Sequence, residues 1–396
     1  MRRAVIVDVV RSPFGRARPG GALDGVHPVD LYAQVLQALV QRTGADPAMV
    51  EDVITGCVIQ VAEQSGNIGR QAVLAAGFPE GVPAVTLDRK CGSAQQAFDF
   101  AAQGVLAGAY DLVIAGGVEM MSLVPMRVNR MGKDNEGPAF HRRYPEGLVR
   151  QGVSAELIAA RWGIGREAMD AFALESHRRA IAAEERGATA QAITPVDIPV
   201  PDGLRRLERD EGPRRDSSLE KLGALRPAFE DAATAARFPE IRWSVTAGNS
   251  SQVTDGAAAV LIAEESVAVR LGLRPRAAIT HFALAGDDPV MMLTAIIPAT
   301  RKILERASMP LDRIDCFEVN EAFASVVLAW LKETGANPDR INRWGGAIAL
   351  GHPVGASGGR LLANLLGTLE ETGGRYGLQT MCESGGMANA TLIELL

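Results

Sequence analysis

The chain has 396 residues, which is more than one ordinary hydrophobic core holds and predicts two or three folded units. Its formal net charge of −6 argues against nucleic acid as the main partner, because lysine and arginine drive that binding. No apolar run reaches the ~18 residues of a membrane span and the first residues lack a signal-peptide cleavage pattern, so we expect a cytoplasmic protein.

The first 119 residues alternate between strand and helix patterns. Apolar, β-branched runs predict strands, and apolar residues at helical spacing predict helices. Strands are expected at residues 4–10, 52–60, 83–88 and 111–117, and helices at residues 28–41 and directly after Cys91. The alternation indicates βαβ units and a sheet that helices cover on both faces.

The alternation stops between residues 120 and 242. This segment is charged and rich in Gly and Pro, and one strong helix is expected at residues 166–186. We interpret it as an insertion of loops and helices that the sheet carries.

The alternation returns in the last third of the chain. Strands are expected at residues 255–265, 276–285, 314–320 and 377–386, and helices at residues 321–333 and 355–371. The small-residue elbow and helix at 355–371, followed by a strand, repeat the pattern that begins at Cys91. The sequence therefore predicts two similar α/β halves with an inserted loop domain.

The sequence favours neither a disulfide framework nor a metal site. Its four cysteines form no CxxC pair, and its five histidines form no HExxH motif. The cysteines are Cys57, Cys91, Cys316 and Cys382. We expect reduced thiols.

Four residues stand where predicted strands end, which is where open α/β sheets bind ligands. Cys91 begins a helix, whose N-terminus lowers a thiol pKa, and Lys90 adds positive charge; a buried apolar filler is the alternative. His352 lies in a glycine-rich turn and is a candidate general base or a structural residue. Asn320 is a helix N-cap or holds a substrate oxygen, and Cys382 alone suggests a core residue.

At these positions the sequence resembles the thiolase family. The ordered motifs are VRSPFGR, CGSAQQAF, AGGVEMMS, LRPAF, TAGNSSQVTDGAAAVL, VNEAFA, GGAIALGHPVGASGGR and a terminal Cys-Gly-Gly segment. The resemblance covers essentially the whole chain and implies a five-layered αβαβα fold. It implies an N-terminal half of residues 1–119 plus 243–270, a loop domain of residues 120–242, and a C-terminal half of residues 271–396.

The resemblance also implies roles for individual residues. Cys91 matches the nucleophile that becomes acylated, His352 the base that activates it, and Cys382 the cysteine that exchanges a proton with the acetyl α-carbon. Asn320 matches a residue that holds a water, which binds the thioester oxygen together with the histidine. The backbone amides of Cys91 and Ser384 match a second oxyanion hole.

For coenzyme A, Ser251 resembles a residue that contacts the pantetheine, and Arg214 one that meets the nucleotide part. The family uses coenzyme A as co-substrate, with no permanently bound cofactor and no metal. Its members are homodimers or homotetramers, with the loop domain bearing the tetramer contacts, and a hydratase/dehydrogenase partner is conceivable. No nucleic-acid partner is expected.

The chain departs from the family pattern in two ways. Ser384 and Ala388 replace the outer glycines of the usual Cys-x-Gly-Gly-Gly-x-Gly motif, and residues 150–156 lack the His and Met of acetoacetyl-CoA-forming enzymes. The second departure favours a degradative 3-ketoacyl-CoA thiolase of fatty acid or steroid side-chain breakdown. An acetoacetyl-CoA-forming acetyltransferase and a non-catalytic acyl-CoA or lipid carrier are the alternatives. The long segment 230–243 is expected to be a surface loop.

Overall fold

The computed structural model describes residues 2–201 and 203–396, and one large mixed sheet runs through it. The strand order is β10-β11-β12-β9-β1-β8-β5-β3-β4, with β2 paired to β8. The strands are β1 (Ala4–Arg11), β2 (Gly15–Arg16), β3 (Val53–Gly56), β4 (Ala84–Leu87), β5 (Leu112–Met120), β8 (Thr254–Glu264), β9 (Ala277–Gly286), β10 (Cys316–Val319), β11 (Tyr376–Glu383) and β12 (Met387–Leu395). β5 and β8 are buried along their whole length, as the apolar runs predict for strands covered on both faces.

The sheet consists of two parts that meet at a short junction. β1 and β9 pair through Val5 with Ala278 and Ile6 with Ala277. Each part contains parallel neighbours: β3 lies between β4 and β5 in the first, and β10 pairs with β11 in the second. The two parts correspond to the two similar halves that the sequence predicts.

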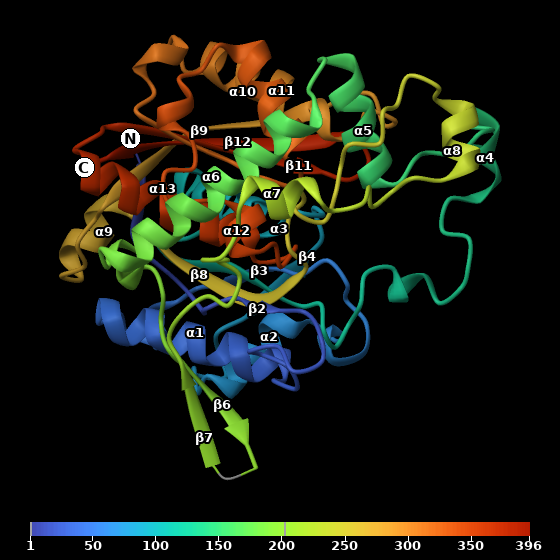
Figure 1. Ribbon diagram of the computed structural model, residues 1–396. Helices are drawn as coiled ribbons and strands as arrows, with labels where there is room; N and C mark the ends of the chain where they lie inside the picture. Colours follow the sequence, from blue (N-terminus) through green and yellow to red (C-terminus); the bar gives the residue numbers. More distant parts are fainter. Residues whose placement is uncertain (1, 202) are drawn as a thin grey trace.

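Helices complete five layers, which Figure 1 shows from bottom to top. α1 (Pro28–Thr43) and α2 (Ile68–Ala75) pack on the outer face of the first part. α3 (Ser93–Ala107) and α13 (Ser357–Thr372) pack against each other between the two parts, and α10 (Ile296–Arg306) and α11 (Ala324–Thr334) lie on the far side. The order is αβαβα, as expected.

Local sequence signals account for the ends of these helices. Pro28 occupies the first turn of α1, where a missing N–H costs nothing, and the His27 side chain accepts a hydrogen bond from the Val29 N–H. Gly108, Gly335 and Gly373 end α3, α11 and α13 in the left-handed conformation. Elements with these signals lie close to their expected positions.

Three expected elements differ in extent. β3 ends at Gly56, because the backbone N–H groups of Val58 and Ile59 turn away to the buried Glu119 carboxylate. The strand expected at 377–386 ends at Glu383, and residues 384–386 turn into β12, which the sequence did not predict. α11 begins at Ala324 with Phe323 at its N-cap position, so Asn320 is not an N-cap.

Residues 121–201 and 203–253 add no strand to the central sheet. They contain α4 (Gly137–Arg143), α5 (Gln151–Arg161), α6 (Arg166–Glu185), α7 (Leu219–Gly223), α8 (Ala232–Arg237) and a hairpin of β6 (Val196–Val200) and β7 (Gly203–Leu207). α6 is the predicted helix, whereas α5 and the hairpin are new; the hairpin projects from the body in Figure 1. The long segment 230–243, expected to be a surface loop, is mostly exposed but contains the helix α8.

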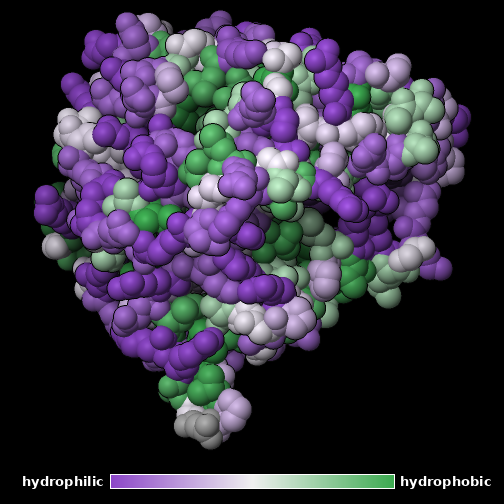
Figure 2. All heavy atoms as spheres, viewed as in Figure 1, coloured by the Kyte–Doolittle hydropathy of each residue, from purple (hydrophilic) through white to green (hydrophobic). Residues whose placement is uncertain are grey.

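The surface view agrees with the composition. Hydrophilic residues cover most of the face in Figure 2, with small hydrophobic patches between them. No helix among the described residues is long and apolar enough to cross a membrane. The remaining short helices are α9 (Glu265–Arg270) and α12 (Ala347–Leu350).

Candidate active site

Cys91 lies in a tight elbow between β4 and α3. Lys90 adopts a positive φ of 51°, and the Ser93 hydroxyl accepts a hydrogen bond from the Arg89 N–H (2.9 Å) while it donates to the Lys90 carbonyl (2.6 Å). These bonds hold the turn that places Cys91 before the first residue of α3. The cysteine is 6 % exposed.

The surroundings of Cys91 differ from the sequence expectation. Burial raises the pKa of the Cys91 thiol, and the nearby Cys382 thiol and Glu383 carboxyl raise it further. Lys90 does not oppose this, because its ammonium pairs with Asp88 at 2.6 Å. The prediction of a thiolate stabilised by the helix and by Lys90 is therefore wrong, and the thiol needs a base to lose its proton.

His352 is held as a neutral base. The Ser357 hydroxyl donates to the Pro353 carbonyl (2.8 Å), so it accepts the Nδ1–H of His352 at 2.6 Å, and Nε2 keeps its lone pair. Burial, with a contribution from the Arg360 charge, lowers the pKa of His352 to about 3. The ring is therefore unprotonated at neutral pH with Nε2 as the proton acceptor.

Asn320 connects His352 to the second cysteine. Its Nδ2 lies 3.5 Å from His352 Nε2, and its Oδ1 is buried without a hydrogen-bond partner among the described residues. Burial raises the pKa of Cys382 to about 12, partly opposed by a hydrogen bond with Asn320. Asn320 thus lies beside both His352 and Cys382, and the Cys382 thiol is near enough to Cys91 to raise its pKa, so the four predicted side chains share one buried region.

The turn after Cys382 accommodates both departures from the glycine motif. Gly385 and Gly386 adopt positive φ values of 93° and 78°, whereas Ser384 is not among the described residues with positive φ. Ala388 lies in β12 opposite Cys382, where any residue adopts the backbone conformation. Among the described residues, neither the Cys91 N–H nor the Ser384 N–H donates a hydrogen bond.

Glu383 is a buried carboxyl that the sequence analysis missed. Both of its oxygens lack hydrogen-bond partners among the described residues, and burial raises its pKa to about 8. Its Oε1 lies so close to Gly92 that a Cβ on residue 92 would collide with it. An acidic residue directly after Cys382 was the available signal, but the sequence did not show that it faces α3.

Arg360 and Glu318 form a second buried pair that the sequence analysis missed. Arg360 Nη1 lies 3.8 Å from Glu318 Oε2, and both side chains are almost fully buried. Arg360 follows Ser357 by one helical turn, and Glu318 precedes Asn320 by two residues in the chain. The pair therefore links α13, whose Ser357 orients His352, to β10, which ends directly before Asn320.

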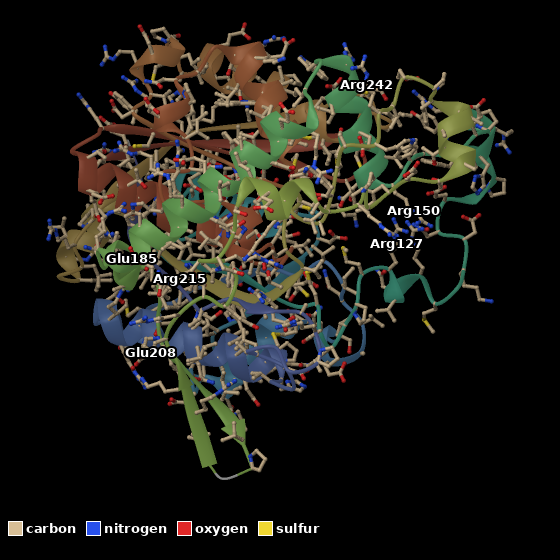
Figure 3. The ribbon with its side chains drawn as sticks, in the orientation of Figure 1. Arg127, Arg150, Glu185, Glu208, Arg215 and Arg242 are labelled. Atoms are coloured by element: carbon tan, nitrogen blue, oxygen red, sulfur yellow. The ribbon has the colours of Figure 1, made fainter. Side chains whose placement is uncertain are left out.

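A cavity of about 180 Å³ lies beside one of the two residues expected to meet coenzyme A. Arg214 lines this cavity with Lys221, His177 and Gln252. The backbone carbonyl of Gln252 accepts a hydrogen bond from the backbone N–H of His352 at 2.9 Å. Its neighbour Arg215 instead pairs with Glu184 and Glu185 at the end of α6 (Figure 3). Ser251 does not line the cavity but lies between lining residues Gly248 and Gln252.

Side chains of the kinds that bind metal ions cluster at a position other than the predicted site residues. Within residues 2–201 and 203–396, a single group has ligand spacing: Asp134, Glu136 and His141, all exposed on the segment around α4. None of the predicted site residues belongs to it. All four cysteines are free and buried.

Family models give the class of this site. The model for the thiolase N-terminal domain matches residues 4–266, and that for the thiolase C-terminal domain matches residues 273–395. The chain belongs to the thiolase family.

Individual relatives are similar over their whole length. The chain is 48% identical to the steroid 3-ketoacyl-CoA thiolase FadA6 of Mycobacterium tuberculosis, covering 100% of this chain and 95% of that protein. It is 41% identical to a 3-ketoacyl-CoA thiolase of Citrobacter koseri, covering 100% and 99%. The crystal structure of the Bacillus anthracis acetyl-CoA acetyltransferase matches with a TM-score of 0.90 at 37% identity, covering 100% and 99%.

Proposed function

We propose that the protein is a degradative 3-ketoacyl-CoA thiolase that cleaves its substrate with coenzyme A through an acyl-Cys91 intermediate. The observation that carries the proposal is the neutral His352, whose Nε2 lone pair faces a site containing Asn320 and two buried cysteines. The chain's similarity to proteins named as 3-ketoacyl-CoA thiolases supports the degradative direction.

The first half-reaction begins with a proton transfer from the Cys91 thiol to His352 Nε2. The thiolate attacks the 3-keto carbon, and the unengaged N–H groups of Cys91 and Ser384 bind the oxyanion. The bond between C2 and C3 then breaks, and the acetyl-CoA enolate oxygen is stabilised by His352 Nε2–H and a water on Asn320. Cys382 protonates the enolate carbon and is left as a thiolate.

The second half-reaction returns the site to its starting state. The Cys382 thiolate takes the thiol proton of a second coenzyme A, which attacks the acyl carbon on Cys91. Cys91 leaves as a thiolate and recovers its proton from His352. Each proton and each bond is accounted for without a permanently bound cofactor, with coenzyme A as co-substrate.

For the domains we propose the division stated from the sequence. The loop domain of residues 120–242 binds coenzyme A through Arg214, with Ser251 contributing from the segment that follows it, and makes oligomer contacts. The exposed edge strand β4, with Val85 44 % exposed, supports homo-oligomer formation, because an uncovered edge favours pairing with another chain. Cytoplasmic location and a hydratase/dehydrogenase partner stay predictions.

Mass spectrometry of the intact protein tests the proposal. After mixing with a 3-ketoacyl-CoA, the wild-type chain should gain the mass of the shortened acyl group on Cys91, and the Cys91→Ala chain should gain none. An unmodified wild-type protein would contradict catalysis through Cys91 and favour the carrier alternative.

Acetoacetyl-CoA formation is the second candidate, favoured by the similarity to the Bacillus anthracis acetyl-CoA acetyltransferase. A panel of acetoacetyl-CoA, longer linear and steroid-derived 3-ketoacyl-CoAs separates the candidates by kcat/KM. We expect the longer substrates to react faster than acetoacetyl-CoA, and the reverse order would overturn the degradative assignment.

A further inference from the structure

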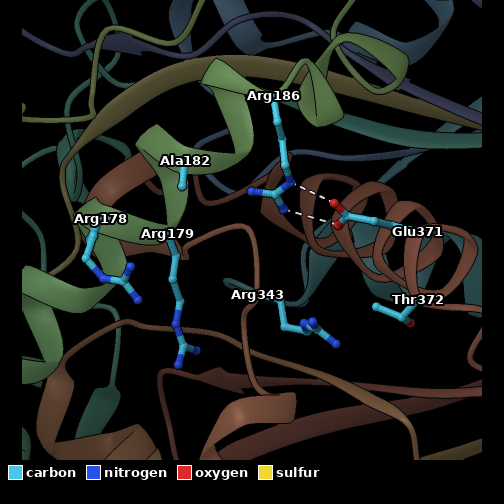
Figure 4. A pocket seen from close by; sticks show the side chains of 7 residues that line it. All are labelled: Arg178, Arg179, Ala182, Arg186, Arg343, Glu371 and Thr372. Atoms are coloured by element: carbon cyan, nitrogen blue, oxygen red, sulfur yellow. Dashed lines mark hydrogen bonds and ion pairs between the residues drawn. The ribbon is translucent and has the colours of Figure 1, made fainter.

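A second cavity lies between the C-terminal half of α6 and the end of α13. Its volume is about 670 Å³, within the usual range of small-molecule sites, and it shares no lining residue with the cavity of Arg214. Figure 4 shows its lining: Arg178, Arg179, Ala182, Arg186, Arg343, Glu371 and Thr372. We call it the arginine cavity.

Positive charge exceeds negative charge in this cavity. Arg186 forms a bidentate pair with Glu371 (2.7 and 3.1 Å), and Arg178 and Arg179 share Glu175. Arg343 is exposed and makes no hydrogen bond or ion pair with any described residue. The four arginines that line the cavity are thus accompanied by only two carboxylates, those of Glu175 and Glu371, which leaves an excess of two positive charges.

Hydrogen bonds hold two of the lining side chains, Arg179 and Glu371, in place. The Arg179 guanidinium donates to the Ile341 carbonyl as well as to Glu175, and the Trp344 indole N–H donates to Glu371 at 2.7 Å. The N–H groups that these bonds leave unused on Arg179 and Arg186, and the whole Arg343 fork, remain as donors. Fixed arginine forks match the oxygens of a phosphoryl group better than flexible lysines do.

The lining also limits what the ligand is. It contains no aromatic side chain to stack on a base, and Ala182 is its one fully apolar residue. Recognition therefore rests on charge and hydrogen bonds. We propose that the arginine cavity is an anion site, separate from the cavity of Arg214, that binds a small polyanion bearing phosphoryl groups.

Isothermal titration of the full chain with inorganic pyrophosphate tests this site. We expect saturable binding that weakens as salt is raised, because salt screens exposed charges. Arg343→Gln should weaken binding at least tenfold without changing the thermal unfolding midpoint, since Arg343 makes no hydrogen bond or ion pair with the residues that the structure describes. Arg343→Lys should weaken it less, because the charge remains while the fork is lost.

The matched control is Arg274→Gln. Arg274 is exposed, makes no hydrogen bond or ion pair with described residues and lines neither cavity, so its removal changes net charge equally. We expect its affinity to stay within twofold of wild type. Absence of saturable binding, or an equal loss in the Arg274 and Arg343 variants, would overturn the proposal.

A second titration, with coenzyme A at saturation, distinguishes two sources of phosphoryl groups. Unchanged pyrophosphate affinity is expected for a separate site. Loss of pyrophosphate binding would overturn the separation and assign the cavity to the phosphates of coenzyme A itself. Neither outcome depends on whether the protein turns over a 3-ketoacyl-CoA.

Discussion

The elbows before α3 and α13 each lead into a helix that begins with a serine, but they hold different chemistry. In the first, Cys91 precedes α3 and its thiol is neutral because it is buried. In the second, His352 precedes α13, and Ser357 on that helix fixes the ring with Nε2 free. Under the proposed mechanism, this difference divides the work: the first half supplies the residue to be acylated, and the second half supplies the groups that move protons.

Replacing each of the two cysteines in turn should show the largest difference between the two halves. Cys91→Ala should lower thiolysis at least ~10⁴-fold, because no other group carries the acyl unit. Cys382→Ala should lose turnover as well but still form the acyl adduct on Cys91, at least on a short time scale. Stopped-flow thiolysis and intact mass measure both, and equal adduct formation in the two variants would contradict the division of roles.

Replacing Asn320 tests the proposed binding of the enolate oxygen by the second half. Asn320→Ala should reduce kcat about 10²–10³-fold, the usual cost of one oxyanion donor, with a smaller change in KM. Acylation of Cys91 should slow in parallel, because the enolate forms in that step. A variant with normal kcat would show that the enolate oxygen binds elsewhere.

Glu383 tests the contact between the halves, because its carboxyl lies against the start of α3. The pKa of about 8 means that this carboxyl is neutral in the folded protein and ionised in the unfolded chain between pH 4.5 and about 8. Unfolding releases a proton in that window, so Glu383 lowers the free energy of unfolding as pH rises, by up to roughly 1.4 kcal/mol per pH unit.

Glu383→Gln removes this dependence. Urea unfolding at pH 5, 6.5 and 8 should show the variant gaining stability relative to wild type as pH rises, since other titrating groups cancel in the difference. Parallel pH profiles for the two proteins would contradict a neutral buried carboxyl.

The smallest effect is expected at the turn after Cys382. Ser384→Gly should leave kcat within about threefold, because residue 384 keeps its N–H and needs no positive φ. Gly385→Ala is the comparison variant and should destabilise the fold by about 1–2 kcal/mol, because it forces a Cβ onto a positive φ. Thermal unfolding and steady-state rates of both variants measure this, and a large kcat loss in Ser384→Gly would assign the serine side chain a role.

Much of the fold was predictable because its signals are local. Apolar runs located β1, β5, β8 and β9, and helical spacing located α1 and α6. β12 was not predicted, because only four residues, including two glycines, separate Cys382 from Met387, and the sequence around this short turn resembles one continuous strand. The pairing of β1 with β9 involves segments about 270 residues apart, which no local pattern encodes.

The sequence by itself determined the family and the two similar halves, and it singled out Cys91, Asn320, His352 and Cys382 as candidate site residues. Only the tertiary structure decided their electrostatics. Burial raises the pKa of the Cys91 thiol, Asp88 neutralises Lys90, and Arg360 and Glu318 lie buried behind His352 and Asn320. The reason is physical: residue types and their order specify which groups are present, whereas a pKa depends on water exclusion and on charges that distant segments bring within reach.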